Sequence, residues 1–507
     1  MYSYKPGCTF QTLEDIKGKN IVVMGLGLNG GGEACVRFFL RHGANVLATD
    51  MKTAAQLAPT IKKLSDDPEI DSSRLSYRLG EHRIEDFQNA DCVIKNPGVK
   101  FEGNKYLAAA KNIETDISIF LHFTKAPVIA VTGSKGKSST VSAINYGLNK
   151  AGFTAFLGGN ITVSPLTFLE KTNEKTPVVL ELSSWQLADL RGRKALKPKI
   201  CVITKIVPDH QNWYHAMEPY VADKRLIYAD QTSDDYSIFD FEGDEPGTGP
   251  ECGGTWGDFF AKETKGTVLR YAKSELPEGF FGVYQTKDAN GTFCGKAILP
   301  GMKEPETILK NLAVPGEHMK INALNAALVL RLMGISSTQC VEIMGEWPGI
   351  DHRLQFFHEY KNSSGGTFRF YNDSCATVPE AAAAASQSFG KPVYLLTGGT
   401  DKGLELTPLE NTLTGKNRND IPVKSLYLLD GNATEKIIPA LNEKNVKFKG
   451  PFKNLAEMLS SLKEEIDAQS TRNEAVVFSP GATSFGMFAN EFDRGNKFMQ
   501  AVKEIFR

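Results

Sequence analysis

The chain has 507 residues, of which 23% are charged, and its formal net charge is −1. This length predicts about three domains, each large enough for its own core. The even balance of charge argues against a polyanion-binding surface, so we expect no nucleic-acid partner. No apolar run approaches 18 residues and the first ten residues lack a signal-peptide core, so we expect a cytoplasmic protein without membrane insertion. Eight cysteines without a C-x-x-C pair indicate reduced thiols.

The first segment, to about residue 115, carries a glycine-rich turn between a strand and a helix. An apolar strand at 21–24 precedes Gly25-Leu26-Gly27-Leu28-Asn29-Gly30, and a helix is expected over 33–41. The next strand, 45–49, ends at Asp50, twenty residues after Gly30. This pattern predicts a Rossmann-like nucleotide site, with NAD, FAD or a turn that binds nothing left open.

A further strand of this segment, 91–95, leads into the turn Asn96-Pro97-Gly98-Val99. Turns at the carboxyl edge of a parallel sheet are where ligands bind in open α/β folds. No catalytic partner for a hydride acceptor is evident, so the nucleotide would serve for binding only and would not react.

The central segment, 116–349, opens with a phosphate-loop pattern. A strand at 128–131 precedes Gly133-Ser134-Lys135-Gly136-Lys137-Ser138-Ser139, and a helix is expected over 141–150. Lys137 would reach the outer phosphates and Ser138 could bind Mg²⁺. The spacing is shorter than in G-x-x-x-x-G-K-[ST], and the alternative is a simple Gly/Ser turn.

Three residues of this segment are candidate metal-site residues. Glu181 ends the strand that begins at 178, His210 follows the strand 200–204, and Lys224 lies in a helical stretch, 220–228. A carboxylate and an imidazole beside phosphates are plausible Mg²⁺ ligands. The alternatives are a surface glutamate, a structural histidine and a solvated helix face for Lys224. Asn322, near the start of an apolar helix, is either a ligand contact or a helix-start residue.

The stretch 232–305 is loop-like and suggests a β-rich insertion. The third segment, 350–507, contains strands near 368–371, 393–396, 425–429 and 475–479. Their ends are rich in Gly, Ser, Thr and Lys, which predicts a third α/β sheet with an anion-binding rim.

Together these motifs resemble the Mur ligases, the ATP-dependent amide-bond-forming family of peptidoglycan precursor synthesis. The resemblance covers essentially the whole chain and is nearest to the branch that adds glutamate to UDP-N-acetylmuramoyl-L-alanine. The shortened loop at Gly133 is typical of the family. The other supporting strings are Leu-Glu181-Leu-Ser-Ser-Trp, Asp209-His210, His352-Arg353, Tyr-Asn372-Asp373-Ser, Gly-Gly-Thr-Asp-Lys402-Gly and Pro-Gly-Ala-Thr-Ser484-Phe.

The resemblance implies an α/β protein of three domains: a Rossmann-like UDP-binding domain, a central P-loop ATPase-type mixed sheet and a C-terminal Rossmann-like domain. It implies a UDP-sugar site at Leu28, Asn29, Asp50, Asn96, Gly98 and Asn160. It implies ATP contacts at Gly133, Ser134, Lys135, Gly136, Lys137, Ser138, Ser139, Asn322, Arg353 and Asp373. The implied catalytic set is Lys137, Glu181, His210 and Lys224, with two Mg²⁺ ions held by Ser138, Glu181, His210 and a carbamylated Lys224. The implied amino-acid site is Thr377, Lys402 and Ser484.

The implied reaction activates the terminal carboxylate of UDP-N-acetylmuramoyl-L-alanine as an acyl phosphate, which glutamate then attacks. We expect a monomer whose third domain closes over the reactants. Two residues depart from the family pattern, because Cys375 stands where a lysine is usual and Glu491 where an aromatic residue is usual. The amino acid is therefore D-glutamate or, alternatively, L-glutamate or another. A non-catalytic nucleotide-binding protein is the second alternative, and a folylpolyglutamate synthetase-like ligase fits less well.

Overall fold

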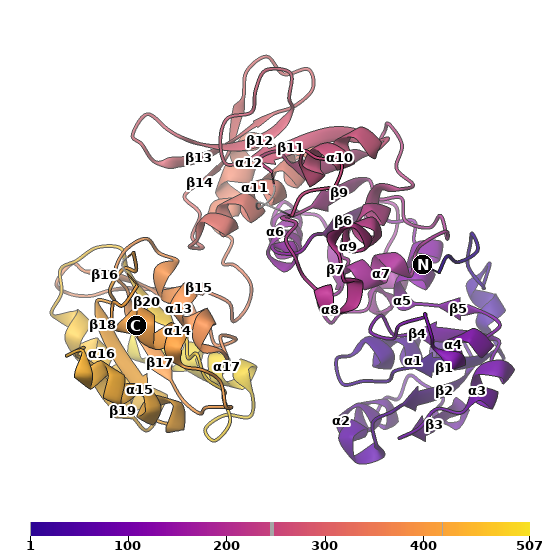
Figure 1. The fold of residues 1–507 in the computed structure, drawn as a ribbon, viewed down its shortest axis with the longest axis horizontal. Coiled ribbons are helices and arrows are strands. Elements are labelled where there is room, and N and C mark those ends of the chain that lie inside the picture. Colours follow the sequence, from indigo (N-terminus) through magenta and orange to yellow (C-terminus); the bar gives the residue numbers. More distant parts are fainter. Residues whose placement is uncertain (1, 244–247, 418) are drawn as a thin grey trace. The chain divides into compact units, whose positions relative to one another are not determined.

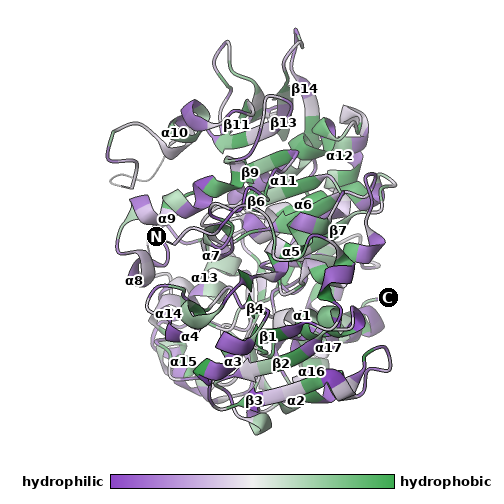
Figure 2. Cartoon of the chain, turned by 90° about the vertical axis from the view of Figure 1, so that its right-hand side faces the viewer, coloured by the Kyte–Doolittle hydropathy of each residue, from purple (hydrophilic) through white to green (hydrophobic). Residues whose placement is uncertain are grey.

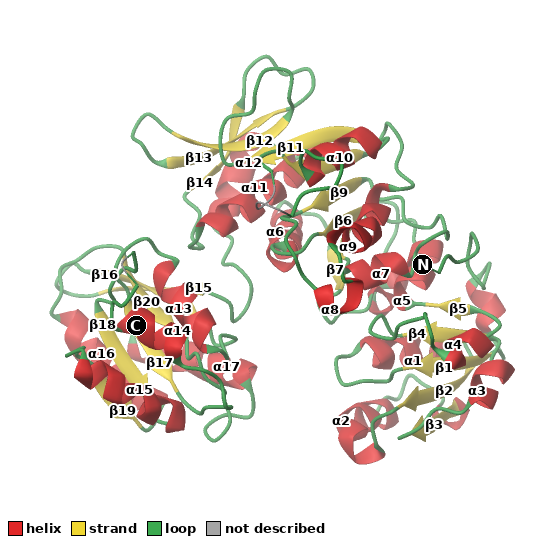
Figure 3. Ribbon diagram, in the orientation of Figure 1, coloured by secondary structure: helices red, strands yellow, loops and turns green. Residues whose placement is uncertain are grey.

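The computed structural model describes residues 2–243, 248–417 and 419–507. The chain forms two compact units. Unit 1 comprises Met1–Lys310 and Ile321–Ile343, and unit 2 comprises Asn311–Lys320 and Met344–Arg507. Three sheets, each flanked by helices, confirm the predicted α/β class (Figure 1, Figure 3). Among the described residues, no helix is both long and apolar enough to cross a membrane.

The first sheet of unit 1 is entirely parallel, in the order β3-β2-β1-β4-β5. Its strands are β1 (Asn20–Met24), β2 (Asn45–Asp50), β3 (Leu75–Leu79), β4 (Cys92–Lys95) and β5 (Ile113–Glu114). Its helices are α1 (Gly31–Arg41), α2 (Ala54–Ser65), α3 (Ile84–Asn89) and α4 (Lys105–Ala109). The strand order changes direction at β1, between β2 and β4, where α/β sheets bind ligands.

The second sheet has nine strands, in the order β14-β13-β12-β11-β10-β9-β6-β8-β7. They are β6 (Val128–Thr132), β7 (Phe156–Gly159), β8 (Val178–Glu181), β9 (Ile200–Ile203), β10 (Tyr236–Asp240), β11 (Thr267–Ala272), β12 (Gly282–Lys287), β13 (Phe293–Ile298) and β14 (Glu306–Lys310). The strands from β7 to β12 are parallel, and β13 and β14 add an antiparallel edge. The stretch 232–305 therefore extends this sheet with β10 to β13.

The helices that accompany the second sheet are α5 (Asp116–Phe123), α6 (Lys137–Lys150), α7 (Ser184–Ala188), α8 (Gln211–Tyr214), α9 (Met217–Lys224), α10 (Trp256–Glu263), α11 (Glu317–Leu332) and α12 (Ser337–Gly345). The buried strands β6 and β9 and the helix α11 are largely hydrophobic (Figure 2). One hydrophobic core runs from Ile21 and Phe38 beside the first sheet to Val178 and Phe260 in the second. This shared core explains why two sheets form one unit. The sequence-based boundaries at residues 115 and 349 stay predictions.

Unit 2 is built on six strands, in the order β15-β16-β20-β17-β18-β19. They are β15 (Gln355–Lys361), β16 (Thr367–Asn372), β17 (Tyr394–Gly398), β18 (Ser425–Leu429), β19 (Lys449–Phe452) and β20 (Glu474–Phe478). All neighbours are parallel except β15 and β16. Its helices are α13 (Pro379–Gln387), α14 (Thr407–Leu413), α15 (Asn432–Glu443), α16 (Leu455–Asp467) and α17 (Glu491–Ile505).

Two helices begin earlier than the sequence pattern predicted. Helix α1 starts at Gly31 instead of 33, and α6 starts at Lys137 instead of 141. Both follow a left-handed glycine, Gly30 at φ 84° and Gly136 at φ 91°. The first turn after each glycine is polar or glycine-rich, so apolar periodicity cannot show it.

The helix of the phosphate loop packs closely on α11. A Cβ on Gly147 of α6 would lie 2.5 Å from a methyl group of Leu330 on α11, whose side chain is fully buried. The close approach of these helices brings Asn322, also on α11, beside the phosphate loop.

We predict that Gly147→Ala destabilises unit 1 by about 1–3 kcal/mol, because an added methyl group overpacks a dense core. The melting temperature measured by calorimetry should fall by several degrees. Leu330→Val in the same chain should recover part of that loss. An unchanged melting temperature for Gly147→Ala would contradict the close α6–α11 packing.

Candidate nucleotide and amino-acid ligase site

The phosphate loop joins β6 to α6, and two of its glycines are required by space. Gly133 has φ 141°, and a Cβ there would overlap the hydroxyl of Thr204. A Cβ on Gly136 would lie 2.5 Å from Oδ1 of Asn322. Asn322 is buried beside the loop, and its contact with a ligand stays a prediction. The shortened loop thus leaves no room for side chains at these two positions.

Two lysines converge on the carbonyl oxygen of Gly133. Lys137 donates to this oxygen and to the Ser134 carbonyl, both at 3.0 Å, and Lys224 donates to it at 2.8 Å. Lys224 is 2% exposed, so the alternative of a solvated helix face is wrong. Burial, reinforced by the neighbouring Lys137, places the pKa of Lys224 well below its usual value. Burial also lowers the pKa of Lys137.

Tyr220, on α9, supports both the loop and Lys224. Its hydroxyl lies 2.9 Å from Oγ of Ser134, and its ring centroid lies 4.5 Å from Nζ of Lys224. Ser134 also donates to the carbonyl of Val207, and its amide donates to the carbonyl of Lys205. These bonds fix the first half of the loop to the segment after β9. Lys135 and Ser138 are exposed and Ser139 is half-buried, so the second half is open to a ligand.

Glu181 ends β8 and is 1% exposed. Its Oε1 accepts a hydrogen bond from the side-chain amide of Asn160 at 3.0 Å. Its Oε2 is buried without a hydrogen-bond partner, which is costly for a carboxylate oxygen. The glutamate therefore has a free, buried oxygen that fits a cation or a hydrogen-bond donor, and the alternative of a surface glutamate is wrong.

His210 lies at the start of α8 in a left-handed conformation, φ 51°. Its ring packs on Trp185, with ring centroids 4.8 Å apart, and its side chain is 44% exposed. The described residues contain no cluster of three or more His, Cys, Asp or Glu side chains able to hold a metal. Glu181 and His210 fit Mg²⁺ only if phosphate oxygens, the Ser138 hydroxyl or a carbamate on Lys224 complete the ligand set.

The first sheet brings together the residues expected to bind the UDP-sugar. Oδ2 of Asp50 accepts from the amide of Gly27 at 2.9 Å, so this carboxylate ties β2 to the glycine-rich turn. Oδ1 of Asn96 accepts from the amide of Gly98 at 3.0 Å. A Cβ on Gly25 would lie 2.9 Å from Cβ of Asn96, so the two loops touch. A cavity of about 30 Å³ lies between them.

Leu28 and Asn29 are exposed at the tip of the glycine-rich turn. Asn160 is exposed as well, and its backbone amide donates to the carbonyl of Glu181. Asn160 therefore contacts the candidate metal site directly, a link that the sequence did not reveal.

In unit 2, Asp373 follows β16 and its carboxylate is buried. Oδ2 accepts from the hydroxyl of Ser479 at 2.6 Å, and Oδ1 accepts from the amide of Leu354 at 3.1 Å. Burial raises the pKa of Asp373 to about 6, and Arg353 opposes that rise. Arg353 itself is exposed.

Three loops of unit 2 carry the expected amino-acid contacts, and hydrogen bonds tie them together. The amide of Gly481 donates to the carbonyl of Ala376, which joins the loop of Thr377 to the loop of Ser484. A bridge between Thr400 and Thr483 joins the Lys402 loop to the Ser484 loop. Lys402 is exposed, Thr377 is half-buried and Ser484 is buried.

The two departures from the family pattern lie beside one buried arginine. Arg494 is 1% exposed and donates to the carbonyls of Ser374 and Ala482. Glu491 and Cys375 both favour its charged form, while burial lowers its pKa to about 10. Although Cys375 replaces the usual lysine, Arg494 therefore still supplies a positive charge beside it.

The structure thus gathers Lys137, Glu181, Lys224, Asn160 and Asn322 in unit 1, and Asp373, Thr377, Lys402 and Ser484 on the loops of unit 2. Sequence reasoning missed Tyr220 and the buried pair Lys95–Asp189, described below. The only signal for Lys95 was a lysine that ends an otherwise apolar strand.

Two family profiles match the chain. The Mur ligase middle domain matches residues 131–330, and the Mur ligase MurD-like N-terminal domain matches residues 19–118. With the phosphate loop and its lysines, these matches define the class: the chain belongs to the Mur ligase family.

Within the family, the chain is similar to UDP-N-acetylmuramoylalanine–D-glutamate ligases. It is 38% identical to that of Treponema pallidum, over 97% of this chain and 98% of the relative. It is 35% identical to that of Borreliella afzelii, over 97% and 99% of the two chains. The relatives match over nearly their whole length.

Solved structures share the fold. The similarity to MurF from Acinetobacter baumannii has a TM-score of 0.55 at 14% identity, covering 99% of this chain and all of that one. The UDP-N-acetylmuramate–alanine ligase MurC from Thermotoga maritima gives 0.52 at 16% identity, covering 96% and 99%.

We predict that Gly136→Ala lowers ATP affinity at least tenfold, because the methyl group meets Asn322 and the residue has φ 91°. Isothermal titration with ATP measures the change. Gly334→Ala is the matched control, because Gly334 has φ 90° and open space around its Cβ. Equal ATP affinity in the two variants would contradict the close contact of loop and α11.

Proposed function

We propose that the chain joins D-glutamate to the terminal carboxyl group of UDP-N-acetylmuramoyl-L-alanine, with conversion of ATP to ADP and phosphate. The observation that carries this proposal is the convergence of Lys137 and Lys224 on the phosphate loop beside the buried carboxylate of Glu181. The relatives named for this reaction, at up to 38% identity, support the same acceptor and amino acid. We take the ligase to be a cytoplasmic monomer.

In the first step, a carboxylate oxygen of the acceptor attacks the γ-phosphorus of ATP, and the bond to the ADP oxygen breaks. Lys137 would leave the carbonyls of Gly133 and Ser134 to meet the phosphate charge, because anionic oxygens bind an ammonium more strongly than carbonyls do. Asn322 and the open half of the loop orient the nucleotide. The product is an acyl phosphate.

In the second step, the amine of glutamate attacks the acyl carbon, the bond to phosphate breaks, and the amine loses a proton. Thr377, Lys402 and Ser484 would hold the carboxylates of the glutamate, with the charge of Arg494 behind them. The positive charge remaining there supports a dicarboxylic amino acid despite Cys375. The buried side chains of Glu181 and Lys224 in unit 1 favour a catalyst over a non-catalytic nucleotide-binding protein.

Members of the Mur ligase family use ATP and Mg²⁺. In this chain Ser138, Glu181 and His210 would hold Mg²⁺, which when bound neutralises phosphate charge. We further propose that Lys224 is carbamylated. Its pKa is well below the usual value, and a neutral amine is the form that reacts with CO₂. The carbamate would replace a buried amine by an anionic oxygen ligand.

An amino-acid screen tests the proposed function. With UDP-N-acetylmuramoyl-L-alanine and ATP present, D-glutamate should release phosphate and L-glutamate should give far less. Phosphate release with L-glutamate but not with D-glutamate would show that the ligase activity is right and the proposed amino acid is wrong. No phosphate release with any amino acid would refute the ligase.

A second prediction concerns Lys224. Lys224→Ala should lower turnover by about 100-fold or more, because an anionic ligand is lost beside the transferred phosphate. Added acetate or formate should restore part of the rate, since a small carboxylate can fill the vacated space. Lys199→Ala is the control, because Lys199, just before β9, is 46% exposed. Full activity of Lys224→Ala, or a rate that carboxylates do not raise, would contradict the carbamate.

A further inference from the structure

The first and second sheets of unit 1 are joined by buried charges that the proposed reaction does not use. Lys95 ends β4, and its Nζ donates to Oδ2 of Asp189 at 2.8 Å; the two side chains are 2% and 7% exposed. Asp189 follows α7 of the second sheet. Arg193, a few residues later, pairs at 2.8 Å with Glu114 of β5. Each pair links one sheet to the other.

A segment at the start of the chain, residues 2–10, covers these pairs. The amides of Tyr4 and Gly7 donate to the carbonyls of Arg191 and Arg193. The guanidinium carbon of Arg193 lies 4.0 Å from the ring centroid of Tyr4, whose hydroxyl reaches Oδ1 of Asp189 at 3.4 Å. We call this segment the N-terminal strap.

The strap also holds the first sheet. The amide and hydroxyl of Thr9 donate to Oε1 of Glu114 at 2.8 and 2.9 Å. The ring of Tyr2 stacks on Phe101, and the amide of Tyr2 donates to Glu102. The strap therefore bonds to the turn 189–193 on one side and to 101–114 on the other.

Gly192 shows how closely the strap lies on the turn. This glycine has φ 81°, and a Cβ there would overlap the Ser3 hydroxyl and the Tyr4 carbonyl. Only glycine leaves room for the strap at this distance.

The pair Lys95–Asp189 sits between two functional loops. Asn96, which follows Lys95, opens the loop expected to bind the UDP-sugar, and Nζ of Lys95 also donates to its carbonyl at 3.1 Å. Asp189 directly follows the helix α7, which begins at Ser184, three residues after Glu181. A single buried bond thus connects the loop that would hold the acceptor to the strand end that would face the phosphates.

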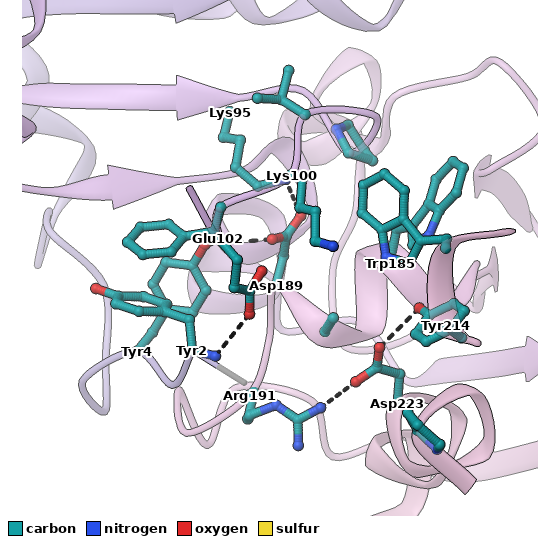
Figure 4. Close-up of a pocket in the computed structure, with 16 residues that line it drawn as sticks. Tyr2, Tyr4, Lys95, Lys100, Glu102, Trp185, Asp189, Arg191, Tyr214 and Asp223 are labelled. Carbon is teal, nitrogen blue, oxygen red and sulfur yellow. Dashed lines mark hydrogen bonds and ion pairs between the residues drawn. The ribbon is translucent and has the colours of Figure 1, made fainter. Parts of the chain in front are cut away.

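A pocket of about 290 Å³ lies beside this junction, and Figure 4 shows Lys95 and Asp189 with Tyr2 and Tyr4 near them. Arg191 and Asp223 form an ion pair on another side of the pocket, and Tyr214 donates to the same carboxylate at 2.8 Å. On this side of the junction, the buried pairs and the strap supply polar contacts between the two sheets in addition to their shared core.

We propose that Lys95 is a positioning residue: paired with Asp189 under the N-terminal strap, it holds the acceptor loop at Asn96 in register with the phosphate site at Glu181. The inference rests on the proposed function. An acceptor anchored on the first sheet must present its carboxylate to a phosphate held by the second, and misplacement by about 1 Å can cost on the order of 100-fold in rate.

The test compares Lys95→Met, Lys95→Arg and the double variant Lys95→Met/Asp189→Leu. Lys95→Met should lower kcat at least tenfold while the KM for ATP stays within twofold, since the phosphate loop is untouched. Lys95→Arg should recover most of kcat, because it can pair with Asp189. The double variant should regain the melting temperature, because no buried charge is left unpaired, yet keep the low kcat. Lys62→Met is the control, because Lys62 pairs with Asp66 on the exposed face of α2.

Two results would overturn the proposal: an unchanged kcat in Lys95→Met, or a double variant in which kcat recovers together with the melting temperature. The latter result would make the pair only structural. Failure of the wild-type chain to release phosphate refutes the proposed function instead. In that case, the UDP affinity measured by titration and the hydrogen-exchange rates of residues 96–102 still test the register. If neither changes in Lys95→Met, the positioning role of Lys95 is overturned.

A second variant tests the strap. Gly192→Ala should expose amides 4 and 7 to hydrogen exchange and lower kcat, and its effect should not add to that of Lys95→Met. Gly291→Ala, with φ 76° and open space, is the matched control. Additive losses in the double variant would show that strap and pair act separately, and would overturn the joint role.

Discussion

The carbonyl oxygen of Gly133 is the point on which the site depends, because it accepts hydrogen bonds from both Lys137 and Lys224. Two ammonium groups at one oxygen would repel each other, and burial adds to the cost of their charges, so the pKa of Lys224 is well below its usual value. The arrangement becomes favourable when anions arrive. Phosphates would draw Lys137 away from the carbonyl, and the carbamate proposed for Lys224 would place an anion where the buried amine now lies. On the proposed function, the loop would therefore be most stable with more negative charge beside it than the unmodified chain supplies.

Steric constraints keep that arrangement in place. Gly133 and Gly136 cannot carry side chains, because Thr204 and Asn322 fill the space. Tyr220 contacts Ser134 and also lies under Lys224, so one ring supports the loop and the lysine together. Asn160 fixes one oxygen of Glu181 and leaves the other free. Lys224 and Glu181 thus have defined positions before any ligand binds.

The sequence predicted the class of the fold and most of the strands, because apolar runs and glycine-rich turns are local signals. It could not decide whether Lys224 is buried, since Asp223 and Arg225 give the helix a solvated pattern. Burial there depends on the phosphate loop, whose Gly133 is 91 residues away in sequence. The contact of Asn322 with Gly136 is hidden for the same reason. The shared core of the first two sheets also escaped prediction, because no local pattern shows which apolar faces meet.

Adjacent residues on α9 connect the phosphate loop to the junction of the two sheets. Lys224 points to Gly133, while Asp223 pairs with Arg191, whose carbonyl accepts from Tyr4 of the N-terminal strap. Asp223 is buried, and burial raises its pKa against the opposing effect of Arg191 and Tyr214. If α9 shifted so that Lys224 stayed on the loop but the ion pair between Asp223 and Arg191 broke, the buried carboxylate of Asp223 would lose a partner. This loss is unfavourable. The helix is therefore restrained from both sides, so the orientation of Lys224 and the junction of the sheets are set by the same contacts.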